Sequence, residues 1–204
     1  MKRYDQYCPI ACALGLVGER WTLLVVRELM QGPKRYTDLA AELPGIGTNI
    51  LAARLKELEA AGLVEKHRLP PPAASTVYEL TSAGRALRPV LHELARFGAR
   101  YLGPPPPEAL EPGWLAGALE VAVSPVAGDV AVAFRIGEEE ASIVDGKVVP
   151  GLTGVADAVV EGDALGFYRL FVDGELDAVR IDGDFRVVEH LVSAFRPATE
   201  PLPA

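Results

Sequence analysis

Apolar residues recur at helical spacing through the first half of the chain. The first stripe predicts one helix and consists of Leu14, Val17, Trp21, Leu24 and Val25. Gly32-Pro33 ends this helix, because proline removes a backbone donor and glycine favours turns. Residues 36–42 predict one or two further helical turns, and residues 43–45 (LPG) predict a tight turn after them.

A longer helix is predicted over residues 48–61. Its buried stripe is expected to consist of Ile50, Leu51, Leu55 and Leu58. Gly62 follows in the position of a C-cap glycine. The two segments around the turn therefore have the order of a helix-turn-helix.

Two short strands, at residues 63–69 and 76–80, are predicted after that helix. Between them lies a proline-rich loop at 70–75. Thr81 is expected to cap a last helix, whose apolar face would hold Leu87, Leu91, Leu94 and Tyr101. Helix, turn, helix and a two-stranded wing make up a winged helix-turn-helix.

The second half of the chain changes its hydrophobic period. Strands are predicted at residues 119–123, 129–136, 141–144, 155–160 and 175–181. Helices are predicted from residue 163 through 172 and from residue 184 through 195. This order indicates an α+β domain with a mostly antiparallel sheet.

Charge divides the chain in the same way. The 204 residues carry a net charge of −8, but residues 1–102 hold 14 Lys and Arg against 10 Asp and Glu, and residues 103–204 hold 6 against 18. The net charges are +4 and −12, so the first half suits phosphate and the second is repelled by it. Four prolines follow Gly103. We therefore expect domains at 1–102 and 112–204, joined by a proline-rich linker at 103–111.

The second helix of a helix-turn-helix fits the major groove and presents its N-terminal residues to base edges. Those residues would be Thr48 and Asn49, and an asparagine amide suits adenine. The cations expected to contact the DNA are Lys34, Arg35, Arg54, Lys56, Lys66 and Arg68. The alternative is a solvated helix pair with ordinary surface charge.

Several blocks in unbroken order resemble the HxlR-type regulators. They are residues 8–10 (CPI), 16–24 (LVGERWTLL), 35–39 (RYTDL), 51–64 (LAARLKELEAAGLV) and 77–84 (VYELTSAG). The resemblance implies a dimeric bacterial regulator that binds a palindromic operator on double-stranded DNA. Two positions depart from the family: Gly47 opens the recognition helix, and Phe97 replaces a tryptophan in the last helix. The first departure affects the expected base preference.

Residues 112–196 resemble a sterol-carrier-protein-2-like domain, through 159–163 (VVEGD) and 177–184 (DAVRIDGD). The resemblance implies an apolar groove for a hydrophobic small-molecule effector. Its candidate lining consists of Leu165, Phe167, Leu170, Phe171, Leu191 and Phe195. The alternative is that these side chains simply fill a core.

Cys8 matches a family cysteine that implies a thiol sensor, with a small buried apolar residue as the alternative. No histidine lies near Cys8 and Cys12, and residues 173–184 lack the glycine of a calcium loop, so no metal is expected. No motif indicates catalysis or a cofactor. No leader or membrane span is evident, so we expect a cytoplasmic protein.

Two hypotheses follow. The first is a ligand-responsive transcription factor whose second domain binds the effector. The second is a lipid carrier or lipid-acting enzyme that uses the first domain as an interaction module.

Overall fold

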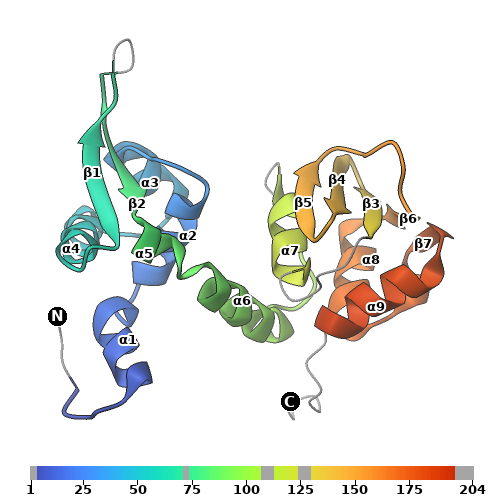
Figure 1. Cartoon of the computed structure of the whole chain (residues 1–204), viewed down its shortest axis with the longest axis horizontal. Helices are drawn as coiled ribbons and strands as arrows, with labels where there is room; N and C mark the ends of the chain where they lie inside the picture. Colours follow the sequence, from blue (N-terminus) through green and yellow to red (C-terminus); the bar gives the residue numbers. More distant parts are fainter. Residues whose placement is uncertain (1–3, 71–73, 107–112, 124–129, 196–204) are drawn as a thin grey trace. The chain divides into compact units, whose positions relative to one another are not determined.

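The computed structural model describes residues 4–70, 74–106, 113–123 and 130–195 (Figure 1). The chain divides into two compact units, Met1–Leu91 and His92–Ala204. The division falls inside helix α6 (Arg88–Leu102), whereas the linker is predicted at 103–111. Residues 107–112, within and beside that linker, lie outside the described residues.

The N-terminal unit is mainly helical and contains one two-stranded hairpin in the described residues. Its elements are α1 (Pro9–Val17), α2 (Thr22–Met30), α3 (Tyr36–Glu42), α4 (Thr48–Ala60), β1 (Val64–Arg68), β2 (Thr76–Leu80) and α5 (Ser82–Arg85). The strands are antiparallel, with Val64 opposite Leu80 and Arg68 opposite Thr76. The predicted order of helix, turn, helix and wing is confirmed.

The prediction of a single first helix is wrong, because this segment forms two helices, α1 and α2. The chain breaks between Gly18 and Trp21, where Trp21 has φ 76° in the left-handed region. A Cβ atom at Gly18 would lie 2.4 Å from the carbonyl oxygen of Leu14. Helical spacing continues across this break, so the periodicity alone did not reveal it.

The core of this unit lies between α2, α3, α4 and the base of the wing. Leu51, Leu55 and Leu58 are almost fully buried, as predicted for α4. Ile50 is 45% exposed, so its assignment to the buried stripe was wrong. The helical period of 3.6 residues turns Ile50 away from the face that its three neighbours share.

The predicted last helix is also two elements. Thr81 caps only the short α5, where its Oγ1 accepts a hydrogen bond from Gly84 N at 3.2 Å. In the second helix, α6, Leu91 packs against the core, but Leu94 is 46% and Tyr101 55% exposed. The prediction of one helix with a single buried face is therefore wrong. Leu91 is covered by the core, whereas Leu94 and Tyr101 are exposed.

The C-terminal unit combines helices with one sheet. Beyond α6 its elements are α7 (Trp114–Val123), β3 (Ala131–Ile136), β4 (Glu139–Val144), β5 (Lys147–Pro150), β6 (Ala158–Gly162), α8 (Ala164–Tyr168), a π-helical segment (Arg169–Asp173), a 3-10 turn (Leu176–Ala178), β7 (Arg180–Gly183) and α9 (Phe185–Phe195). In the described residues the sheet order is β5-β4-β3-β6-β7. Only the β3–β6 pair in this sheet is parallel, so the expected mostly antiparallel α+β arrangement is confirmed.

Three predictions for this unit need correction. Residues 119–123 belong to helix α7, because Leu115, Leu119 and Ala122 form a buried helical stripe that the small apolar residues had obscured. The strand expected at 175–181 begins only at Arg180, after the 3-10 turn. Strand β5 was not predicted, since its four residues are too few to show an alternation.

Among the described residues, no single helix is long and apolar enough to cross a bilayer. Together α1 and α2 reach the required length and composition, but they are bent by 79° at their break.

Candidate nucleic-acid interface

The turn between α3 and α4 is held from both sides. Leu39 and Leu43 are buried below it, and Tyr36 Oη donates a 2.7 Å hydrogen bond to the carbonyl oxygen of Thr48. Gly45 has φ +87°, a conformation that favours glycine. These contacts fix the direction in which α4 begins.

The first turn of α4 is open to solvent. Thr48, Asn49 and Ile50 are exposed, whereas Leu51 directly after them is fully buried. The amide of Asn49 is a donor and an acceptor, and Ile50 is an apolar surface beside it. The site therefore offers hydrogen bonding and a methyl contact, the two ways of reading base edges in a major groove. Sequence periodicity missed Ile50 because it assigned that side chain to the core.

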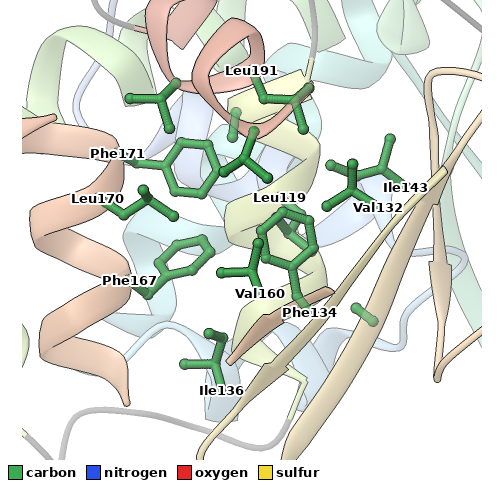
Figure 2. Close-up of a cluster of buried hydrophobic side chains, with 14 of the residues drawn as sticks. Leu119, Val132, Phe134, Ile136, Ile143, Val160, Phe167, Leu170, Phe171 and Leu191 are labelled. Carbon is green, nitrogen blue, oxygen red and sulfur yellow. The ribbon is translucent and has the colours of Figure 1, made fainter. Parts of the chain in front are cut away.

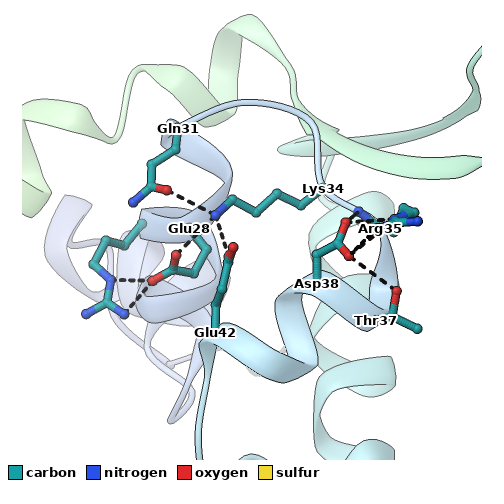
Figure 3. Close-up of polar contacts among 8 residues, drawn as sticks. Glu28, Gln31, Lys34, Arg35, Thr37, Asp38 and Glu42 are labelled. Atoms are coloured by element: carbon teal, nitrogen blue, oxygen red, sulfur yellow. Dashed lines mark hydrogen bonds and ion pairs between the residues drawn. The ribbon is translucent and has the colours of Figure 1, made fainter. Parts of the chain in front are cut away.

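Lys34, which is predicted to contact phosphate, lies in a network of polar contacts within the N-terminal unit. Its Nζ lies 3.4 Å from Glu28 Oε2 and donates hydrogen bonds to Gln31 Oε1 at 3.0 Å and to Glu42 (Figure 3). The side chain is only 12% exposed. Its charge is therefore compensated inside the unit, between α2 and α3.

Arg35 lies beside this network and is more exposed, at 58%. Its Nε lies 2.9 Å from Asp38 Oδ2, and Asp38 also accepts a hydrogen bond from the Arg35 backbone at the start of α3 (Figure 3). The side-chain hydrogen bond raises the pKa of Arg35 and lowers that of Asp38. Arg35 can reach solvent, but its charge is partly compensated.

Arg54 is a structural cation. Its Nη1 lies 3.3 Å from Glu19 Oε2 and 3.1 Å from Glu57 Oε2, and the side chain is 12% exposed. These ion pairs compensate the charge of Arg54, and its predicted contact with the DNA backbone stays a prediction. The arginine lies on the side of α4 that faces the break between α1 and α2, where Glu19 is located. The spacing of the leucines in α4 did not reveal this contact.

Three of the predicted cations are exposed and, within the part of the chain that the structure describes, form no ion pair: Lys56, Lys66 and Arg68. Lys66 Nζ lies 5.4 Å from the centre of the Tyr78 ring across the hairpin. Arg68 Nε donates to the carbonyl oxygen of Ala74 at 3.1 Å. Strand β1 of the wing thus carries two exposed cations, and α4 carries one.

The two cysteines have free thiols on α1. Cys8 is partly exposed at the N-cap position and Cys12 is exposed. Lys2 and Arg3, two cations close to Cys8 in the sequence, lie outside the described residues.

The residues expected to line an effector groove are mostly core residues. Phe167, Leu170, Phe171, Leu191 and Phe195 are buried in one cluster against the sheet (Figure 2). The Phe167 and Phe171 rings are 4.8 Å apart, and Phe171 meets Phe195 edge to face at 5.7 Å. Leu165 is 41% exposed and is not a member of this cluster. The packing agrees with the alternative of a filled core.

Comparisons with known proteins give one consistent result for the N-terminal part of the chain. The sequence pattern of the HxlR-like helix-turn-helix matches residues 16–105. The HTH-type transcriptional regulator YodB of Bacillus subtilis is 38% identical over 98 residues, which are 48% of this chain and 88% of YodB.

Two further relatives are similar over the same region. The uncharacterized HTH-type transcriptional regulator YvaP of Bacillus subtilis is 33% identical over 49% of this chain and 94% of its own length. The uncharacterized HTH-type transcriptional regulator sll1512 of Synechocystis is 36% identical over 47% of this chain and 70% of its own length. These matches agree with the order of helices, turn and wing in the N-terminal unit. The chain belongs to the HxlR-like helix-turn-helix family of transcriptional regulators.

Proposed function

We propose that the chain binds an operator in double-stranded DNA through the first turn of α4 and the wing. The observation that carries this proposal is the exposure of Thr48, Asn49 and Ile50 beside a buried Leu51. A helix whose rear face is anchored in a core can enter the major groove without losing its position. Asn49 would read a base edge, and Ile50 would contact a thymine methyl group.

The backbone contacts in this proposal come from the uncompensated cations. Lys56 would meet a phosphate beside the groove, and Lys66 and Arg68 would bring the wing to the neighbouring phosphates or minor groove. Arg35 is an additional, weaker candidate because the negative charge of Asp38 partly compensates that of Arg35. Lys34 and Arg54 support the fold of the reading head and are excluded from the contact set.

We also propose a homodimer on a palindromic site, since one reading head contacts only a few base pairs. Its support is an exposed apolar stripe on α6, formed by Val90, Leu94, Phe97 and Tyr101. These positions recur every three or four residues, so they share one helical face. Leu14 on α1 is also exposed, at 47%.

In this proposal the C-terminal unit has a regulatory role and does not contact the DNA. The net charge of −12 over residues 103–204 opposes contact with phosphate. The hypothesis of an apolar effector in a sterol-carrier-protein-2-like domain rests on sequence resemblance. It gains no support from the buried cluster, whose aromatic rings pack on one another.

Selection of binding sites from random duplex DNA, with the full chain, tests the function. We expect an enriched palindrome whose half-site preference changes in Asn49→Ala and Ile50→Ser. A protein that enriches no sequence would refute operator binding. Enrichment that neither substitution alters would show that α4 is not the reading helix.

A further inference from the structure

A group of metal-ligating side chains lies on the wing, apart from the cations assigned to DNA. Glu65 and His67 are two residues apart on β1, so they project from the same face of the hairpin. Glu79 on β2 is directly opposite Glu65. One carboxylate oxygen from each glutamate and one imidazole nitrogen of His67 all lie within 4.8 Å of one another.

Two of these ligand atoms are already near the separation that a metal ion requires. His67 Nε2 lies 3.7 Å from Glu79 Oε2. In a tetrahedral site with bonds of about 2.0–2.2 Å, the ligand atoms are roughly 3.4 Å apart. Glu65 is exposed, so its side chain can rotate to bring the third oxygen to the same distance.

Arg85 orients the Glu79 carboxylate, and the like charges of Glu65 and Glu79 face each other across the hairpin. Arg85 Nη1 lies 3.5 Å from Glu79 Oε1, on the carboxylate oxygen that does not face His67. Such outer contacts orient metal-binding carboxylates. Glu65 and Glu79 are cross-strand partners with like charge, a pairing that destabilises a hairpin unless a cation lies between them.

We propose that Glu65, His67 and Glu79 bind a divalent transition-metal ion of the Zn²⁺ class. A nitrogen ligand with two carboxylates favours such ions over Mg²⁺ and Ca²⁺, which prefer oxygen ligands throughout. Water completes the coordination on the exposed side. Because the ligands come from both strands, the ion joins β1 to β2 and stabilises the wing. This inference does not depend on DNA binding.

The test is a titration of the full chain with Co²⁺, a spectroscopic substitute for Zn²⁺, in a Cys8→Ser, Cys12→Ser background. This background removes the two thiols, which are competing metal ligands. We expect one equivalent of Co²⁺ to bind with the visible absorption of a four- or five-coordinate site and to be displaced by Zn²⁺. His67→Gln and Glu79→Gln should each weaken binding at least about tenfold, a loss typical of altered metal sites.

His190→Gln is the matched control, because His190 is an exposed histidine on α9. It should leave Co²⁺ binding unchanged, and circular dichroism should show that all variants are folded. Zn²⁺ should also raise the thermal midpoint of the protein with His67 but not that of His67→Gln. The proposal is overturned if Co²⁺ does not bind at micromolar concentrations, or if folded His67→Gln binds it as tightly as the parent.

Discussion

The guanidinium group of Arg54 lies 3.3 Å from the carboxylate of Glu19 and joins the proposed recognition helix to the break between α1 and α2. The arginine side chain is 12% exposed and the glutamate side chain 41%. Trp21, two residues after Glu19, lies below the α3–α4 turn, where a Cβ atom at Gly45 would come within 3.9 Å of its ring. The break in the helix therefore supports α4.

Arg54→Ala should lower the free energy of unfolding by about 1–2 kcal/mol, because Glu57 and Glu19 lose a shared, largely buried partner. A double-mutant cycle with Glu19→Gln should give a coupling of about 0.5–1 kcal/mol, measured by urea unfolding. Arg186→Ala on α9 is the control, since that arginine is exposed and forms no ion pair within the described residues, and should change stability by less than about 0.5 kcal/mol. A stable Arg54→Ala with a reduced salt dependence of DNA binding would instead restore Arg54 as a phosphate contact.

Lys56→Ala should weaken binding to all DNA sequences alike. The slope of log K against log salt should decrease in magnitude by about one for each protomer, because one phosphate contact is lost. Fluorescence anisotropy at several salt concentrations measures this slope. Lys147→Ala on β5 removes an exposed lysine from the acidic half and should leave the slope unaltered. An unchanged slope in Lys56→Ala would place that lysine away from the DNA.

Asn49→Ala should alter sequence preference more than overall affinity. Loss of a bidentate base contact should remove about 1–3 kcal/mol of discrimination at one position of each half-site. Ile50→Ser should act at a neighbouring thymine through loss of a methyl contact. Competition binding with single-base operator variants measures both effects, and Thr37→Ala on the exposed side of α3 serves as the control. Equal discrimination in all three variants would contradict the assignment.

Phe97→Asp should convert a dimer into a monomer. Phe97 is 61% exposed, and its ring centre lies 5.1 Å from that of Tyr101, so the charge would fall within the apolar stripe of α6. Light scattering at micromolar concentration should show half the parent mass. Ala95→Asp adds the same charge on another side of α6 and should remain dimeric. A monomeric parent protein would refute the dimer itself.

Phe171→Ala should destabilise the C-terminal unit by about 3–5 kcal/mol, as expected for removal of a large ring from a packed core. Leu165→Ala should cost less than about 1 kcal/mol because that side chain is 41% exposed. Urea unfolding followed by circular dichroism measures both. A small cost for Phe171→Ala, accompanied by loss of saturable binding of a hydrophobic fluorescent probe, would support the effector groove instead of the filled core.

The buried side of α4 was predictable from the sequence because Leu51, Leu55 and Leu58 follow the period of a helix. The wing was equally predictable, since two short strands flank a proline-rich loop. Such local patterns depend on backbone geometry over a few residues, and they also carried the resemblance that the comparisons confirmed for residues 16–105.

The partners of the charged side chains were decided only by tertiary structure. Lys34, Arg54 and Lys56 are all cations in the sequence, yet two of them meet carboxylates from other elements and the third remains exposed. Helical periodicity likewise continued across the break before Trp21 and included Ile50 in the core. A sequence pattern records spacing along one element, whereas burial and ion pairing depend on which other elements pack beside it.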